Sequence, residues 1–244
     1  MLAPCYIVIA VLGVIVVLHL LFELHYFTRS LLTVVVGLFC KKKKHILDTL
    51  SVKGICLTSD IDVLLYHMNN ARYLREVDFA RIDFYQRTGL LSHIRAKGGG
   101  VVQGAATIRY RRFIRPFHVF RIDSRIIYWD ASSIFMEHRF VTPKDNFVRA
   151  IAVCRQKVID CNAEEIMTDL LGRPEPKMAT TMTGVSNPSA VIEMEPEDKD
   201  NKMHTVVLDP VKPNGLPSKP ALPLEVAKWL ESNEISSANL RNGC

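Results

Sequence analysis

One long amphipathic helix followed by four consecutive strand-like runs limits this chain to few architectures. The helix is predicted over residues 69–89, where Asn69 or Asn70 is suited to cap the start and Gly89 to end it. Apolar residues recur there at spacings of four, three and four, on one face: Tyr73, Val77, Ala80 and Phe84. We therefore expect a single, half-buried helix.

The four strand-like runs follow three glycines at 98–100 and are separated by turn residues. They cover 101–113, 118–129, 134–141 and 147–159, and a shorter extended piece, 51–57, precedes the helix. An antiparallel sheet that curls around one helix buries both the apolar face of the helix and the apolar residues of the strands. The sequence therefore predicts an α+β fold.

Shifts in composition divide the chain into four parts. We expect a hydrophobic membrane anchor with a basic flank over 1–44, a folded domain over 45–172, a flexible proline-rich insertion over 173–220 and a C-terminal helix over 221–244. Nine of the twelve prolines lie at or beyond Pro174, which is why the third part is expected to lack fixed structure. Three apolar residues of the last part are expected to dock on the domain: Leu224, Trp229 and Leu230.

The leader is expected to enter a membrane. Residues 5–22 are apolar except for His19, and these 18 residues lie near the lower limit for a spanning helix. A second apolar stretch, Leu31 to Cys40, is too short to span alone. The two stretches form either one tilted hairpin or one span followed by an interfacial segment. We favour the second.

A block of four lysines, Lys41, Lys42, Lys43 and Lys44, follows the leader. Positive residues beside a span tend to stay cytosolic. The block is either a plain stop-transfer signal, which we favour, or a site that attracts anionic lipid. We expect a protein of the endoplasmic reticulum membrane with its domain in the cytosol. Secretion after cleavage is the alternative, although Met1 to Pro4 lack the basic residues of a signal peptide.

Charge and cysteine spacing exclude several classes of site. The net charge is +6, but residues 1–44 hold five basic groups and one acidic group, which leaves only +2 on residues 45–244. Nucleic acid is therefore not an expected partner. The six cysteines form no C-x-x-C pair, and no histidine matches the H-E-x-x-H spacing. We expect neither a metal site nor a cofactor.

The segment just before the predicted helix concentrates the polar groups that suit acyl chemistry. It contains two carboxylates, one imidazole and two carboxamides: Asp60, Asp62, His67, Asn69 and Asn70. A helix start offers unpaired N–H groups that can stabilise an oxyanion, and a carboxylate can attack a carbonyl or activate water. The same residues also suit a plain turn, a helix cap and a partly buried histidine. Both interpretations stay open on these residues alone.

This segment resembles the signature of hotdog-fold thioesterases of the 4-hydroxybenzoyl-CoA and acyl-ACP thioesterase type. The resemblance rests on Asp-Ile-Asp followed by His-Met-Asn-Asn-Ala-Arg-Tyr-Leu, and it extends over about residues 52 to 160. A subgroup of these proteins shares the hydrophobic leader and the C-terminal W-x-x-x-N-E-x-S-S run at 229–237. The resemblance implies an antiparallel sheet around one central helix, an acyl-CoA or other acyl thioester as substrate, and a homodimer.

The resemblance also assigns roles to residues. It implies that Asp62 is the catalytic carboxylate, acting as nucleophile or general base. Asn69 and Asn70 would shape the helix start, where backbone N–H groups form the oxyanion site. His67 would orient the loop, and Tyr73 would pack inward. The spacing from Asp62 to His67 departs from the family pattern, so Asp60 is the alternative inward carboxylate.

A second basic group lies on the predicted strands: Arg109, Arg111, Arg112, Arg115, Arg121 and Arg125. It is either a site for the phosphates of coenzyme A or, as we favour, the solvated face of two paired strands. Two functions then compete for the chain as a whole. The first is a membrane-anchored acyl-CoA thioesterase, and the alternative is a non-catalytic hotdog module that binds an acyl chain or a protein partner.

Overall fold

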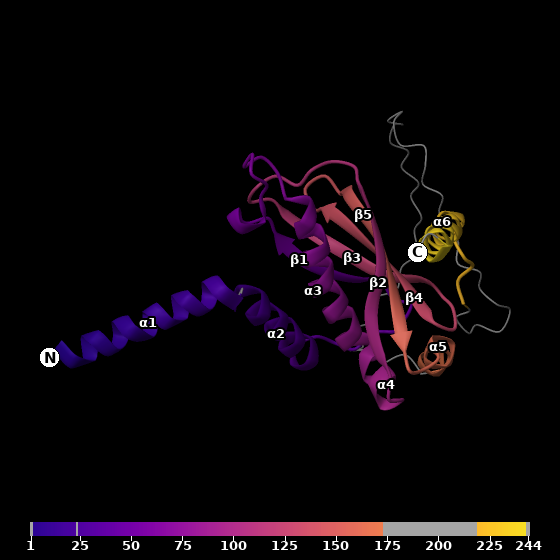
Figure 1. Cartoon of the computed structure of the whole chain (residues 1–244), viewed down its shortest axis with the longest axis horizontal. Coiled ribbons are helices and arrows are strands. Elements are labelled where there is room, and N and C mark those ends of the chain that lie inside the picture. Colours follow the sequence, from indigo (N-terminus) through magenta and orange to yellow (C-terminus); the bar gives the residue numbers. More distant parts are fainter. Residues whose placement is uncertain (1, 23, 173–218, 243–244) are drawn as a thin grey trace, which may run out of the picture.

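The computed structural model describes residues 2–22, 24–172 and 219–242 (Figure 1). Most of the expected proline-rich insertion therefore lies outside the described residues. The helices are α1 (Leu2–Phe22), α2 (Leu24–Phe39), α3 (Asn70–Thr88), α4 (Leu90–Ala96), α5 (Ala163–Leu171) and α6 (Leu224–Asn242). The strands are β1 (Leu50–Ile55), β2 (Gly100–Tyr110), β3 (Val119–Trp129), β4 (Ser133–Thr142) and β5 (Phe147–Ile159).

The strands form one antiparallel sheet in the order β1-β3-β4-β5-β2. The predicted α+β architecture is therefore confirmed, with α3 lying across the sheet (Figure 1). Apolar residues of alternate positions on β3, β4 and β5 cover the inner face beneath α3, as the period of two in a strand requires. They include Phe120, Ile122, Phe140, Ala150, Ala152 and Cys154.

The predicted apolar face of α3 forms the centre of this core. Tyr73, Val77, Ala80 and Phe84 are each no more than 1% exposed, which confirms the helical periodicity. Gly89 ends the helix in the left-handed conformation, with φ of 76°, and its N–H donates to the Tyr85 carbonyl. A side chain with a Cβ adopts this conformation only at a cost, which explains the glycine.

The start of α3 distinguishes its two asparagines. Asn69 is the N-cap, and its side-chain oxygen accepts a hydrogen bond of 2.9 Å from the Ala71 N–H. Asn70 is the first helical residue and is exposed. Only the first asparagine therefore stabilises the helix start through its side chain.

Two short helices were not predicted from the sequence. α4 follows Gly89 directly, and α5 begins after the N-cap Asn162, whose side chain accepts from the Glu164 N–H. Each has fewer than ten residues, too few for a clear periodic pattern. Both pack into a second core cluster at the end of α3, together with Trp129 and Ile134.

α6 covers the outer face of the sheet. Val226 is 2% exposed, and Trp229 and Leu230 pack against a cluster that includes Phe135 and Val153. The prediction that Leu224 also docks is wrong, because this residue is 73% exposed. Leu224 is the first residue of α6, and the first buried residue of this helix is Val226.

α2 packs along one flank of α3. Arg29 donates two hydrogen bonds to the carboxylate of Glu76, one of them 2.6 Å long, and Lys41 lies 2.5 Å from a carboxylate oxygen of Asp83. Burial raises the pKa of Glu76, and the Arg29 guanidinium opposes that rise. Both carboxylates are buried on α3, so the cations of α2 and the lysine block compensate them.

Aromatic contacts complete this interface. Phe79 is 2% exposed, the Tyr26 ring lies 5.5 Å from it between centroids, and the Arg29 guanidinium lies 4.0 Å from its centroid. Gly37 is buried, and an added Cβ there would lie 3.2 Å from the Gln86 side chain. Figure 1 shows the resulting order of layers: α2, α3, the sheet and α6.

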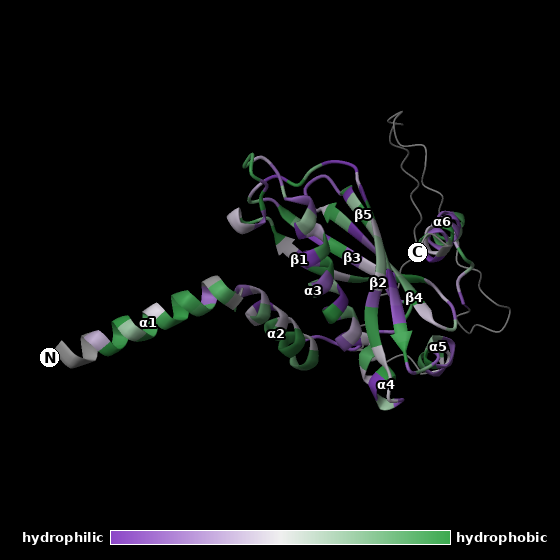
Figure 2. Cartoon of the chain, in the orientation of Figure 1, coloured by the Kyte–Doolittle hydropathy of each residue, from purple (hydrophilic) through white to green (hydrophobic). Residues whose placement is uncertain are grey.

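α1 leads away from the domain (Figure 1). Hydrophobic residues occur along the length of both α1 and α2 (Figure 2). Within the described residues neither helix alone has the length and apolarity of a membrane span. The segments Tyr6–His19 and Leu24–Phe39 meet these criteria only as a pair, with a bend of 83° between them.

Loss of the Arg29 guanidinium should destabilise the domain. In Arg29→Gln the buried carboxylate of Glu76 loses its ion pair, and we expect the free energy of unfolding to fall by about 2–3 kcal/mol. This loss in the free energy of unfolding should be smaller than the loss from breaking a fully buried ion pair, because the Arg29 side chain is 30% exposed. Chemical denaturation of the full chain in detergent measures the change. Arg95→Gln, at an exposed position of α4, is the matched control, and equal losses in both variants would contradict the expectation.

The helix cap gives a second stability prediction. Asn69→Ala removes the acceptor for the Ala71 N–H and should lower the free energy of unfolding by about 1 kcal/mol. Asn70→Ala removes only an exposed side chain and should cost less than about 0.5 kcal/mol. Thermal unfolding of the two variants side by side measures the difference, and a larger loss for Asn70→Ala would be inconsistent with the cap.

Candidate functional site

The candidate site is the loop that connects β1 to α3. Its two ends are held together by an antiparallel bridge between Ile61 and Met68 and by a hydrogen bond of 2.8 Å from the Asn69 N–H to the Asp60 carbonyl. Met68 is fully buried, and its N–H donates to the Ile114 carbonyl at 2.8 Å. The loop is therefore closed on itself and fastened to the segment that follows β2.

Asp60 is the more buried of the two loop aspartates. It is 8% exposed and ends a 3₁₀ turn, Thr58–Asp60. One of its carboxylate oxygens accepts a hydrogen bond of 3.0 Å from the Leu57 N–H. Its charge acts on two buried neighbours, because it contributes to the raised pKa values of Cys56 and Glu76. Its hydrogen bond makes Asp60 a residue that shapes the turn.

Asp62 lies nearer to solvent, at the start of the loop. Partial burial raises the pKa of its carboxyl, but hydrogen bonds from the Tyr66 and His67 N–H groups and the nearby imidazole outweigh this effect and lower the pKa overall. The Tyr66 N–H lies 3.2 Å from the Asp62 Oδ1 atom. Hydrogen bonds that favour the charged form keep this carboxylate ionised at neutral pH.

His67 lies between the two aspartates and the helix start. Its Nδ1 atom is 2.9 Å from the Met68 carbonyl, and its Nε2 atom is 3.8 Å from the Asp62 Oδ2 atom. Its ring stacks on Phe113 with 5.6 Å between centroids. The distance to Asp62 exceeds that of a hydrogen bond, so the imidazole supports the loop by packing on Phe113 and by its contact with the Met68 carbonyl.

One backbone N–H at the start of α3 lacks a hydrogen-bond acceptor among the described residues. The Ala71 N–H is bound by the Asn69 side chain, and the Arg72 N–H by the Asn69 carbonyl. In the described part of the chain, the Asn70 N–H has no such acceptor. Asn70 also accepts, through its carbonyl, a hydrogen bond of 3.0 Å from the Tyr110 hydroxyl. An open N–H at the positive end of a helix can stabilise a developing oxyanion.

The tip of the loop is apolar and exposed. Val63 is 93% exposed, Leu64 78%, Leu65 71% and Tyr66 52%. Leu65 has a φ of 55°, which is an uncommon conformation for a leucine. These residues occupy the interval that departs from the spacing of the hotdog thioesterases. The tip lies outside the hydrogen-bonded base of the loop.

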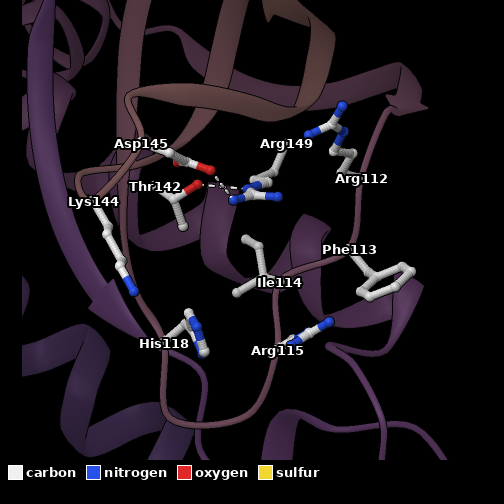
Figure 3. Close-up of a pocket in the computed structure, with 9 residues that line it drawn as sticks. All are labelled: Arg112, Phe113, Ile114, Arg115, His118, Thr142, Lys144, Asp145 and Arg149. Carbon is white, nitrogen blue, oxygen red and sulfur yellow. Dashed lines mark hydrogen bonds and ion pairs between the residues drawn. The ribbon is translucent and has the colours of Figure 1, made fainter.

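A cationic cavity lies beside the loop, and sequence analysis did not find it as a unit (Figure 3). Its volume is about 610 Å³. Four cationic side chains line it against one carboxylate, together with neutral residues: Arg112, Arg115, Lys144, Arg149, Asp145, His118, Thr142, Phe113 and Ile114. Arg149 is held by Asp145 and by a hydrogen bond of 2.5 Å to Thr142. Arg112, Arg115 and Lys144 form no ion pair with any described residue.

This cavity shares its wall with the loop. Phe113 stacks on His67, and the Ile114 carbonyl accepts the Met68 N–H. The cavity residues come from two segments about thirty positions apart, 112–118 and 142–149, which only the folded chain brings together. An ionised carboxylate, a helix start and a group of cations thus lie around one loop.

The predicted arginine group does not form one surface. The expectation of two paired strands is wrong, because β2 pairs with β5 while β3 lies between β1 and β4. Arg121 pairs with Asp123, and Arg125 pairs with Glu137. Arg111 and Arg112 lie over the Phe147 ring. Only Arg112 and Arg115 of the six line the cavity.

A further polar side chain lies inside the domain and is suited to a structural role. His138 is fully buried on β4 and lies 2.8 Å from the Ser124 hydroxyl. Burial, aided by the Arg81 charge, lowers its pKa to about 3. The imidazole is therefore neutral at physiological pH. Among the described residues, no group of histidine, cysteine and carboxylate side chains could hold a metal ion.

A family model and individual relatives among known proteins both identify the same family. Residues 56–230 match the model of the thioesterase-like superfamily. The chain is 44% identical to Protein THEM6 of Drosophila melanogaster over 156 residues, which cover 64% of this chain and 81% of that protein. It is 42% identical to Protein THEM6 of Danio rerio over 155 residues, 62% of this chain and 75% of the relative.

Among solved structures, a probable thioesterase from Escherichia coli, YbaW, is 22% identical and superposes with a TM-score of 0.47. That superposition covers 50% of this chain and 96% of the bacterial one. The family model spans well over half of the present chain, and the animal relatives are matched over most of their length. The chain therefore belongs to the thioesterase-like superfamily and is similar to the THEM6 proteins.

Proposed function

We propose that this protein hydrolyses acyl thioesters of coenzyme A at the loop between β1 and α3. One observation carries the proposal: the ionised Asp62, the start of α3 and the cationic cavity lie around the same closed loop. Membership of the thioesterase-like superfamily supports the reaction class. The geometry of the loop supports the choice of residues.

Asp62 is the proposed catalytic carboxylate. As general base it takes a proton from water, which attacks the thioester carbonyl, and the carbon–sulfur bond then breaks to release a thiolate that is protonated by solvent. As nucleophile it forms an anhydride that water hydrolyses. The Asn70 N–H is the proposed oxyanion donor. His67 and Asp60 are positioning residues, because each supports the loop through packing or hydrogen bonds.

The cationic cavity suits the phosphates of the carrier. Arginine and lysine bind phosphate through charge-assisted hydrogen bonds. Arg112, Arg115 and Lys144 are exposed and lack carboxylate partners among the described residues, so their charge is available to an anion. Coenzyme A carries phosphates at one end and the thioester at the other, which matches a cavity beside a reaction site.

Two further features of the assembly are proposed. β2 pairs with β5 on one side only, and its outer edge has no strand partner in the described residues. An unpaired edge favours pairing with another chain, so we propose a homodimer joined at β2. We also propose that the apolar leader holds the protein in the endoplasmic reticulum membrane with the domain in the cytosol, where acyl-CoA is present.

A non-catalytic binding module is the second candidate. It is favoured by the hydrogen bonds of Asp62, whose carboxylate binds N–H groups of its own loop rather than pointing free into a cavity. In that case the site would bind an acyl chain or a protein partner and leave the thioester intact.

The first test of the proposal is thioester turnover. Full-length protein in detergent micelles is given acyl-CoA esters of several chain lengths while free thiol is followed. Asp62→Asn keeps the shape of the side chain but removes its charge, and should lower kcat by about 10²–10⁴-fold. Asp160→Asn is the control, because Asp160 is exposed and asparagine tolerates its positive φ. Negligible turnover in wild type and both variants, with ligand still bound, would favour the binding module.

The cavity gives a separate test. Arg115→Ala combined with Lys144→Ala removes two phosphate contacts and should raise KM for acyl-CoA about tenfold or more, with little change in kcat. KM for the same acyl group on N-acetylcysteamine, which lacks the nucleotide, should not change. An equal rise for both substrates would assign these residues to general folding rather than to phosphate binding.

A further inference from the structure

α2 presents two chemically different faces. One face lies on α3 through Tyr26, Arg29 and Gly37. The opposite face is a stripe of exposed apolar side chains, which we call the outer stripe: Leu24, Phe27, Leu31, Leu32, Val35, Leu38 and Phe39. Spacings of three and four residues, together with two adjacent pairs, place them on one side of the helix. A stripe of this length open to water is costly and indicates an unassigned contact.

The inner face of α2 is held too firmly for the helix to turn the stripe away. The carboxylate of Glu76 is 5% exposed and that of Asp83 is wholly buried, and each pairs with a cation from the α2 segment. Lys43 also donates to the Gln86 carbonyl at 2.6 Å, and the Lys44 N–H to the Arg87 carbonyl at 3.0 Å. If α2 left α3, Glu76 would lose its ion pair with Arg29, and Asp83 would keep only the longer contact of 3.5 Å with Arg87 of α3 itself.

We propose that the outer stripe rests in the interfacial layer of a lipid bilayer, so that α2 fixes the orientation of the whole domain on the membrane. The chain itself points to lipid as the occupant. α1 precedes α2 by a single residue, and its large apolar side chains from Tyr6 to Leu18 are exposed, from 67% at Tyr6 to 40% at Leu18. The two helices are bent by 83°, as expected when one enters a bilayer and the other lies along its surface.

The orientation follows from the order of layers. The outer stripe faces lipid, then come α2, α3, the sheet and finally α6, which lies farthest from the membrane (Figure 1). The ion pair of Arg29 with Glu76 fixes α2 to α3, and the first turn of α3 forms one end of the candidate loop. The inference rests on the proposed membrane anchoring and not on catalysis.

Depth-dependent quenching tests this orientation. A fluorescent label is attached to a single cysteine introduced at one of three exposed positions, Val14 in α1, Leu31 in α2 or Ile235 in α6. The accessible native cysteines are replaced by serine. Full-length protein is reconstituted in vesicles of phosphatidylcholine and phosphatidylserine that carry nitroxides at shallow or deep positions.

The label at Leu31 should be quenched more by shallow nitroxides, the label at Val14 more by deep ones, and the label at Ile235 by neither. A quenched Val14 with an unquenched Leu31 would overturn the proposal and indicate that another molecule, such as a second copy, covers the stripe. Quenching at Ile235 would overturn the orientation. No quenching at Val14 would refute the membrane anchoring itself, whatever the turnover assays report.

A clamp variant separates docking from membrane binding. Arg29→Gln combined with Lys41→Gln leaves the outer stripe intact, so Leu31 should stay quenched. The efficiency of energy transfer from a donor at Ile235 to acceptor lipids should rise on average. Its distribution should also broaden, because the domain is no longer held at one distance from the membrane. An unchanged, narrow transfer distribution would show that these ion pairs do not set the orientation.

Discussion

The burial of two carboxylates on one flank of α3, between this helix and α2, is the constraint on which the leader and the domain both depend. Glu76 and Asp83 lie on the flank of the central helix against which α2 packs, and the Glu76 carboxylate also lies close to Gly54 of β1. Arg29 and Lys41 pair with these two carboxylates. Burying charges is favourable only when partners are held in place, so α2 is docked as firmly as an element of the core.

The packing of α2 on α3 joins two parts of the chain with different chemical properties. On the sheet side of α3, apolar residues build the core, and at its start the closed loop holds an ionised Asp62 near an open amide. On the far side, α2 exposes an apolar stripe. The central helix α3 therefore joins the proposed membrane contact, through the ion pair of Glu76 with Arg29, to the proposed reaction site at its start.

Much of the fold was predictable because it follows local periodicity. The apolar spacing of α3, its end at Gly89 and the span of β5 were all predicted, and the structure confirms them. The sequence left the cap open between Asn69 and Asn70, and the structure assigns it to Asn69. α4 and α5 were missed because they are short, and the docking of Leu224 was wrong because a helix face does not specify where contact begins. In the candidate site, the sequence named the loop residues but left open which aspartate is buried.

The sequence by itself determined the types of the long elements, the polar motif before the central helix and the apolar character of the leader, since these depend on neighbours along the chain. Only the tertiary structure decided that Asp60 is the more buried aspartate, that Arg112 and Arg115 join Lys144 in one cavity, and that the basic flank of the leader pairs with α3. These features unite residues dozens of positions apart. Their contacts arise from strand order and from the compensation of buried charge, which no local pattern encodes.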